Sequence, residues 1–353
     1  MILLGLVGSA RRLAFVGLAK NTGKTVALGA LLDELGAAGL RVGVTSVGRD
    51  GEQRDVIDVR VDKPRVRLAE GSLVASTDSL LRASGLPFEL LEQTRVRTPL
   101  GRVLVVRLCG AGSVEVAGPS AVADVRGVCD AMLCHGAERV LIDGAMDRRA
   151  ACSPDIVDGV VLSTGAVLGR EISEVVSRTT DAVDLVRLAR LEDRGEGARV
   201  RAIAAAHGER GVSVLVGEDT QPVVLAPRFA LTAGAGELAR LLDARPDARY
   251  LLLAGALPEA FARELAHALH HRCRRLSVVV TDSTRVFTTR RGVGWYGRHG
   301  LEIQVLNAIA LNAVTVNPLA PASHRFDSAQ LQALIREAIP DVPIVDVLQP
   351  HQR

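Results

Sequence analysis

The chain has 353 residues, of which 48% are apolar and 24% charged, and its formal net charge is +3. Domains typically have about 100 to 200 residues, so this length predicts two domains, and the apolar fraction excludes a wholly disordered chain. The five cysteines include no CxxC pair, which argues against a disulfide framework and against a cysteine-rich zinc site. The small, scattered positive charge and the scarcity of aromatic residues disfavour a nucleic-acid partner.

The N-terminal segment is apolar before it is basic, which is the reverse of a secretory signal. No apolar stretch reaches the about 18 residues that a membrane-spanning helix needs. We therefore expect a cytoplasmic protein with no membrane association.

Short apolar runs alternate with Ala/Leu-rich runs along the first half of the chain, a pattern typical of strands and helices in turn. The expected strands are 13–17, 41–47, 139–143 and 158–163, with further strand-rich stretches at 56–68 and 95–116. The expected helices are 23–38, 120–134 and 170–188.

The charged, glycine-bearing segment Leu191–Arg199 is the best candidate for a linker, and alternation resumes beyond it. There the expected strands are 223–226, 250–253, 276–281, 313–317 and 343–347, and the expected helices are 235–242, 258–271 and 327–338. This alternation predicts an α/β protein with a first domain over residues 1–190, built on a mostly parallel sheet, and a second α/β domain over 200–353. In such sheets ligands bind beyond the carboxyl ends of the strands.

The strongest functional signal is the segment LAFVGLAKNTGKT, in which an apolar strand leads to Gly17 and the triplet Gly23-Lys24-Thr25 opens a helix. This is the strand–loop–helix context of a phosphate-binding loop, or P-loop, where backbone amides and the helix dipole attract phosphate oxygens. Lys24 is expected to reach the β- and γ-phosphates of ATP, and the Thr25 hydroxyl to bind Mg²⁺. The expected nucleotide contacts are Gly17, Lys20, Asn21, Thr22, Gly23, Lys24, Thr25 and Val26. The helix is expected to pack through Val26, Leu28, Leu31, Leu32 and Leu35.

Lysine usage supports this interpretation. Of 43 basic residues only Lys20, Lys24 and Lys63 are lysines, and the first two lie within five residues of each other. Since the chain otherwise uses arginine, this spacing indicates that lysine itself is required there. The alternative is an Ala/Gly-rich turn that contains GKT by chance.

A carboxylate at the end of a neighbouring strand would complete a magnesium site. The run Arg139-Val-Leu-Ile-Asp143 has the form of a Walker B strand, so Asp143 is expected where the strand emerges, as a metal-shell residue. Lys24 and Asp143 are the two expected catalytic residues. The alternative is an aspartate that caps a surface strand.

The loop after the second strand, TSVGRDGEQRD, offers a further acid. Asp50, or Glu52, is expected to complete the Mg²⁺ shell, although a solvated turn explains this loop nearly as well. Asp147, Arg148 and Arg149 follow the Walker B-like strand and could contact phosphate or a partner.

Five residues separate Gly17 from Gly23, one more than in the usual P-loop, and in this the sequence resembles the dethiobiotin synthetase-like branch of P-loop proteins. Several segments together resemble one family of that branch, the P-loop subunit of the lysine 5,6-aminomutase reactivase. They are GLAKNTGKT from Gly17, TSVGRDGE from Thr45, RTPLGRV from Arg97, VEVAGPS from Val114, LIDGAMDRR from Leu141, LSTGA from Leu162 and VLNAIALNAVTVNPLAP from Val305.

This resemblance covers most of the chain and implies a function. The protein would act with a MutS-related ATPase subunit and use ATP and Mg²⁺ to exchange damaged cofactor on a B12-dependent aminomutase. Two alternatives stay open: a dethiobiotin synthetase-like ligase that activates a carboxylate with the γ-phosphate, and a nucleotide-binding regulatory module with negligible turnover. Related synthetases use a lysine in the loop after the second strand, where this chain has Arg49; Lys63 could replace it.

Overall fold

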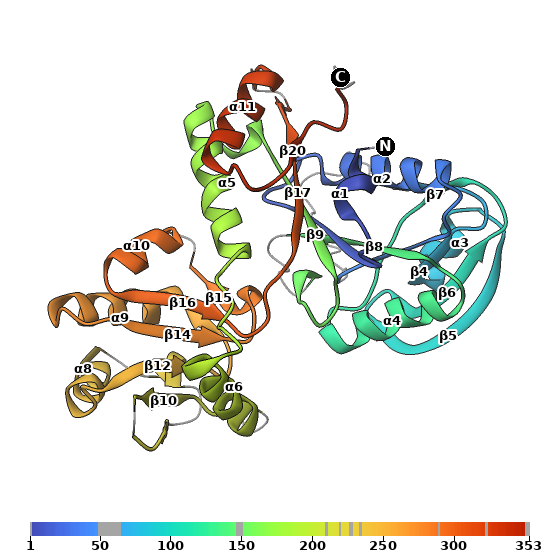
Figure 1. Cartoon of the computed structure of the whole chain (residues 1–353). Helices are drawn as coiled ribbons and strands as arrows, with labels where there is room; N and C mark the ends of the chain where they lie inside the picture. The colour runs from blue at the N-terminus through green and yellow to red at the C-terminus, as the bar shows by residue number, and fades with distance from the viewer. Residues whose placement is uncertain are drawn as a thin grey trace. The chain divides into compact units, whose positions relative to one another are not determined.

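The computed structural model describes residues 2–48, 65–145, 151–208, 211–218, 220–225, 229–232, 235–288, 290–321 and 324–349. The chain divides into two compact units (Figure 1). The first unit consists of Met1–Thr180 and Ala310–Arg353, and the second of Asp181–Ile309. No helix among these described residues is both long and apolar enough to cross a bilayer.

The first unit contains a nine-stranded sheet in the order β20-β17-β9-β1-β8-β2-β4-β6-β5. Its strands are β1 (Arg12–Gly17), β2 (Val42–Ser46), β4 (Leu73–Thr77), β5 (Phe88–Thr98), β6 (Gly101–Leu108), β8 (Arg139–Ala145), β9 (Gly159–Gly165), β17 (Leu311–Asn317) and β20 (Ile344–Val345). All pairs from β20 to β4 are parallel, whereas the hairpin β5–β6 is antiparallel and β6 also pairs antiparallel with β4. The expected α/β class is confirmed, and the sheet is mixed.

The other elements of this unit surround the sheet or extend its loops. The helices are α1 (Leu3–Val7), α2 (Lys24–Ala37), α3 (Asp78–Ala83), α4 (Val122–Cys134), α5 (Ile172–Val186, which runs on into the second unit) and α11 (Ser328–Ala338), with a 3-10 turn at Ala166–Leu168. Two small ladders pair β3 (Val66–Leu68) with β7 (Gly112–Val114) and β18 (Leu319–Ala320) with β19 (His324–Arg325).

Helices α2 and α4 cover opposite faces of the sheet. Side chains alternate between the two faces of a strand. On β2, Val42 and Val44 belong to the buried cluster that includes the leucines of α2. Gly43 lies between them, and a Cβ atom there would come within 3.0 Å of the sulfur of Met132 on α4. The sheet is therefore buried on both faces, which explains its continuous apolar strands.

The second unit is a smaller α/β layer with the strand order β11-β10-β12-β14-β16. Its strands are β10 (Val214–Gly217), β11 (Val223–Val224), β12 (Ala248–Leu252), β14 (Leu276–Val280) and β16 (Leu301–Val305), and a separate ladder pairs β13 (Leu257–Pro258) with β15 (Val286–Phe287). Its helices are α6 (Gly195–Gly208), α7 (Phe229–Thr232), α8 (Ala235–Ala244), α9 (Glu259–His271) and α10 (Val293–Arg298), with a 3-10 turn at Ser283–Arg285. Strands β12, β14 and β16 are parallel, and β10 runs antiparallel to β12.

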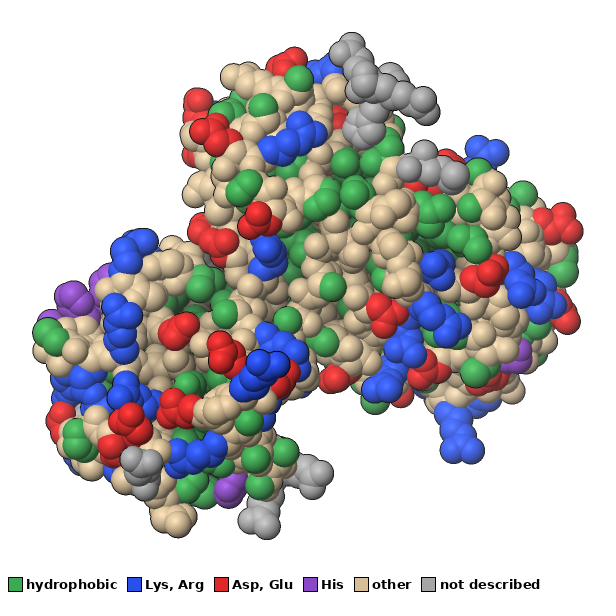
Figure 2. Space-filling view, viewed as in Figure 1, with side chains coloured by type: hydrophobic (Ala, Val, Ile, Leu, Met, Phe, Trp, Pro, Cys, Tyr) green, Lys and Arg blue, Asp and Glu red, His purple; other side chains and the backbone are tan. Residues whose placement is uncertain are grey.

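Two apolar clusters cover the two faces of this second sheet. Val200 of α6 packs with Val214 and Leu252 on one face. Leu265 and other residues of α8 and α9 pack on the opposite face with Leu251. On the face of the molecule drawn in Figure 2, basic and acidic side chains are interspersed on the surface.

The expected domain division needs correction. Residues 310–353 were assigned to the second domain, but β17 and β20 pair next to β9 in the sheet of the first unit. A strand pattern shows that residues 313–317 form a strand, but it does not show which sheet that strand joins. Here it joins β9, whose buried backbone groups need hydrogen-bonding partners. Leu191–Arg199 is not simply a linker, since Leu191 is buried and α6 begins at Gly195.

Most expected elements of the first half correspond to observed ones within two residues, including β1, α2, β2, α4, β8, β9 and α5. Of the expected strand-rich stretch 56–68, residues 56–64 lie outside the described residues. Its last three residues form β3. The sequence patterns missed α1, β4, α3, β10, α6, α10 and β16, several of which are short. The five cysteines, all among the described residues, form no disulfide there.

Candidate functional site

The glycine loop, residues 17–23, joins β1 to α2 at the carboxyl edge of the nine-stranded sheet. Two of its residues have left-handed backbones, Asn21 with φ 68° and Gly23 with φ 87°. At Gly17 a Cβ atom would lie 2.5 Å from Oγ1 of Thr22, so the loop folds back tightly on the end of β1. Gly17 is therefore required by close packing, and Gly23 by its left-handed backbone.

Three hydrogen bonds fix the loop. The hydroxyl of the buried Thr22 donates to the carbonyl of Ala19 at 3.0 Å. From β9, the carbonyl of Ser163 accepts from the amide of Leu18 at 2.9 Å. From β17, the side-chain amide of Asn317 donates to the carbonyl of Asn21 at 2.9 Å. The loop is thus tied to β9 and β17, which lie on the same side of β1 in the sheet.

The start of α2 is open to an anion. The first amides of a helix have no acceptor within the helix. In α2 the amide of Ala27 donates to the carbonyl of Gly23, so the amides that precede Ala27 are the ones without a helical acceptor. Helix α2 has no side-chain cap and no acidic residue in its first turn. The helix itself therefore supplies no carboxylate to these amides or to the positive end of its dipole.

Lys24 and Asp143 form an ion pair beside this helix start. Leu141 of β8 belongs to the cluster on the α2 face, and Asp143, two residues further on, points to the same face. β8 is parallel to β1, with Asp143 paired to Phe15 in the register, so its carboxylate meets the first residue of α2. Each side chain is about one-fifth exposed, 23% for Lys24 and 22% for Asp143.

The expectation for Asp143 needs one refinement. It was placed where the strand emerges, but β8 continues through Gly144 to Ala145. The strand continues because Gly144 and Ala145 pair in register with Val16 and Gly17 of β1.

A pocket of about 330 Å³ adjoins the loop on the side of β17 and β20. The loop and the start of α2 line it with Thr22, Gly23 and Val26, and the C-terminal segment lines it with residues 315–319, Arg325 and 346–349.

The expectation that Val26 packs in the core with the leucines of the helix is wrong, since its side chain is 44% exposed. Leu28, Leu31, Leu32 and Leu35 are buried as expected.

Lys20 is exposed and lines a second pocket, of about 440 Å³, with residues that follow β9 and β17. Three basic side chains, Lys20, Arg170 and Arg178, line this space next to the glycine loop, together with one carboxylate, that of Glu174. A site for an anion is the chemistry that this arrangement favours.

Of the expected metal-binding residues, Thr25 and Asp143 are described and come from the adjacent elements α2 and β8. Asp50 and Glu52, like Arg49, Lys63, Asp147, Arg148 and Arg149, lie outside the described residues. In the part of the chain that the structure covers, no group of three His, Cys, Asp or Glu residues is placed to hold a metal ion.

Sequence reasoning missed the contribution of the C-terminal segment to this site. Asn317 bonds the loop, and Asp346, buried at 4% exposure, lines the pocket beside it. One signal was available: the Asn317-Pro318 pair directly after an apolar run marks a strand end, where ligands bind in α/β sheets. The position of that strand beside β9 could not be found from the pattern alone.

Comparison of the chain with protein-family models, with curated proteins and with solved structures gave no match.

Proposed function

We propose that this chain is a P-loop protein that binds ATP with Mg²⁺ at the glycine loop. The observation that carries the proposal is the Lys24–Asp143 ion pair at the uncapped start of α2. It places a cation, a row of free amides and a carboxylate around one point, where a phosphate chain and its metal would be held.

The residues present suit both ligands. The Thr25 hydroxyl and the Asp143 carboxylate are oxygen ligands of the kind that Mg²⁺ takes. When bound, the metal would neutralise charge on the phosphate oxygens. Lys24 neutralises Asp143 in this structure. With nucleotide bound, Lys24 would contact the phosphates, and Asp143 would be available to hold the metal or its water. The pocket beside Val26 has room for the nucleoside.

Isothermal calorimetry with ATP and Mg²⁺ tests this site. Lys24→Ala removes a charge-assisted contact worth about 1.5–3 kcal/mol, so we expect the affinity to fall at least about tenfold. Arg82→Ala is the control, because it removes an exposed cation of α3 that pairs only locally with Asp78 among the described residues. Affinity for ATP equal in the wild type and in Lys24→Ala would refute the proposal.

Asp143→Asn separates metal binding from folding. The substitution keeps size and removes the charge, so we expect Mg²⁺-dependent hydrolysis to fall while the free energy of unfolding changes by less than about 1 kcal/mol. Malachite-green phosphate release and urea unfolding measure the two quantities. Normal hydrolysis, or loss of the folded state, would contradict the assignment of Asp143 to the metal shell.

We further propose that nucleotide turnover serves a partner, as in the reactivase of a B12-dependent lysine 5,6-aminomutase with its MutS-related ATPase. Three of the segments on which this resemblance rests meet around the loop. LSTGA contains Ser163, VTVNPLAP contains Asn317, and LIDGA contains Asp143, each of which contacts residues 18–24. VEVAGPS contacts the end of β2, where the amide of Gly118 donates to the Ser46 hydroxyl. These three segments support the proposal at the loop, whereas RTPLGRV lies in the hairpin β5–β6 at the edge of the sheet.

A reconstitution assay tests this second step. Inactivated aminomutase is mixed with ATP, Mg²⁺, fresh adenosylcobalamin, the MutS-related subunit and this protein, and activity should return. Rescue that proceeds equally well without this protein, or with Lys24→Ala, would disprove the reactivase function but leave nucleotide binding intact.

A ligase remains the second candidate, and one observation favours it. The pocket lined by Lys20, Arg170 and Arg178 could hold an anionic substrate next to the phosphate loop. A ligase requires ATP turnover that depends on a small carboxylate substrate and that does not respond to the aminomutase. Stimulation by the aminomutase alone would exclude it.

A further inference from the structure

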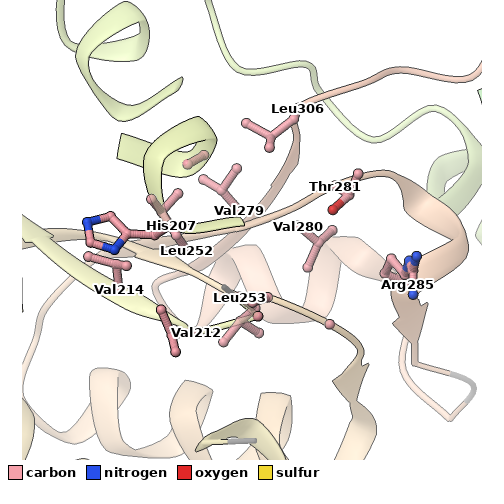
Figure 3. Close-up of a pocket in the computed structure, with 14 residues that line it drawn as sticks. His207, Val212, Val214, Leu252, Leu253, Val279, Val280, Thr281, Arg285 and Leu306 are labelled. Atoms are coloured by element: carbon pink, nitrogen blue, oxygen red, sulfur yellow. The ribbon is translucent and has the colours of Figure 1, made fainter. Parts of the chain in front are cut away.

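The second unit contains a pocket of its own, of about 250 Å³ (Figure 3). It lies where the carboxyl ends of β12, β14 and β16 meet the amino end of β10. The register pairs Val214 at the start of β10 with Leu252 at the end of β12, and Leu252 with Val279 of β14. This edge is the place where α/β sheets bind ligands, because the loops that follow the strands diverge there.

Most of the pocket surface is apolar. Val212, Leu253 and Val280 are among the side chains that form its walls, and Leu253 and Val280 are buried, at 5% and 0% exposure. Val280 lies on β14 and Leu253 directly follows β12, and both strands are packed on both faces, so these walls are fixed by the core of the unit. A space of this size with such walls suits a small molecule with an apolar body.

Three polar side chains line the pocket, His207 at one end and Thr281 and Arg285 toward the other (Figure 3). At one end, His207 from the last turn of α6 has a buried Nδ1 atom for which the described residues provide no hydrogen-bond partner. At the other end, the exposed guanidinium of Arg285 follows β14 in the 3-10 turn, and no carboxylate of the described residues pairs with it. Buried polar atoms usually have a hydrogen-bond partner, so Nδ1 of this imidazole can still form a hydrogen bond with a ligand.

We infer that this pocket binds a small carboxylic acid with an apolar body and a polar atom at its far end. The guanidinium of Arg285 presents a planar pair of donors that matches a carboxylate. The valine and leucine walls hold the apolar body, and Nδ1 of His207 forms a hydrogen bond with the polar atom at the other end. A phosphate is a poorer fit, since this pocket offers one guanidinium where a phosphate site collects several amide donors. The site does not depend on nucleotide binding in the first unit.

The test uses three probes and ligand-observed NMR on the full chain. 4-Phenylbutanoate has the carboxylate and the apolar body, 4-phenylbutanamide lacks the charge, and 4-(4-hydroxyphenyl)butanoate adds the polar atom. We expect 4-phenylbutanoate to bind at millimolar concentration or below, the amide at least about tenfold more weakly, and the hydroxyl compound more tightly. No binding of either acid by the wild type would overturn the inference.

Variants locate the binding. Arg285→Ala should weaken 4-phenylbutanoate at least about tenfold, whereas Arg263→Ala, which removes an exposed cation of α9 away from the pocket, should not. His207→Phe should abolish the advantage of the hydroxyl compound, and Ala204→Leu should fill the pocket and exclude all three probes. Circular dichroism and thermal unfolding check that each variant is folded. Binding that survives both Arg285→Ala and Ala204→Leu in folded protein would place the acid elsewhere and refute the site.

Discussion

The glycine loop of the first unit and the pocket of the second occupy the same kind of place, the carboxyl edge of parallel strands, yet they are built from different parts of the chain. The loop is made mainly of backbone: glycines, amides and carbonyls held by Ser163 and Asn317, with one ion pair added. The pocket is made of side chains: valines and leucines, with His207 and Arg285 at its ends. A backbone site is sensitive to atoms that are added, and a side-chain site to atoms that are removed.

The largest effect is expected from a truncation in the second unit. Leu253→Ala removes a buried side chain from the wall of the pocket, and such substitutions cost about 2–5 kcal/mol. Urea unfolding should show a loss of about 3 kcal/mol. As a control, Leu231→Ala truncates a leucine of α7 that is 67% exposed, and it should cost less than about 0.5 kcal/mol. Equal losses would mean that the pocket walls do not belong to the core.

The reverse change tests the first unit. A Cβ at Gly118 would lie 1.9 Å from the carbonyl oxygen of Ser46, a backbone atom at the end of β2. Gly118→Ala therefore forces two chain segments apart, and we expect a cost of about 2 kcal/mol in urea unfolding. Gly127→Ala in α4 meets nothing within 4 Å and should be neutral or stabilising. If Gly118→Ala is as stable as wild type, close backbone contact is not what shapes this edge.

A subtler change sharpens the claim about the loop itself. Gly17→Ala places a methyl group 2.5 Å from Oγ1 of the buried Thr22, so the loop must shift. We expect ATP affinity in calorimetry to fall about tenfold, or about 1.4 kcal/mol. Gly29→Ala lies on α2 with nothing within 4 Å, and it should keep the affinity while raising stability by up to about 1 kcal/mol. Unchanged affinity in Gly17→Ala would show that the loop tolerates added atoms.

The smallest effect concerns Tyr296, a fully buried side chain of the second unit. Burial raises its pKa to about 12 from an ordinary value of 10.0, so the folded chain favours the neutral phenol. Its contribution to stability is complete below about pH 10 and is lost as the pH rises toward 12. Because its hydroxyl has no hydrogen-bond partner among the described residues, Tyr296→Phe should change stability by less than about 1 kcal/mol at neutral pH.

Thermal unfolding at increasing pH compares the two proteins. The wild type should lose stability above pH 10, and Tyr296→Phe should lose less of it over the same range. Parallel curves would assign the alkaline loss to other groups.

Local sequence patterns predicted the glycine loop, but they did not predict the contribution of Asn317 from β17 to the site. Gly17, Gly23, Lys24 and Thr25 lie in one stretch of the chain, where strand, turn glycine and helix start are all visible in the sequence. Asn317 comes from a strand that pairs with a distant part of the chain, since Thr315 lies opposite Ser163 of β9, 152 residues away. No local pattern records such a pairing.

By itself the sequence determined the α/β class, most elements of the first half, the glycine loop and the choice of Lys24 and Asp143, because each of these depends on residue type and on spacing within a short window. The tertiary structure alone decided that residues 310–353 return to the first unit, that Lys24 meets Asp143, and that Val26 faces a pocket. It also decided that His207 and Arg285 share one cavity. Strand order is set by hydrogen bonds and apolar packing between distant segments, and these energies depend on which surfaces meet in the folded chain.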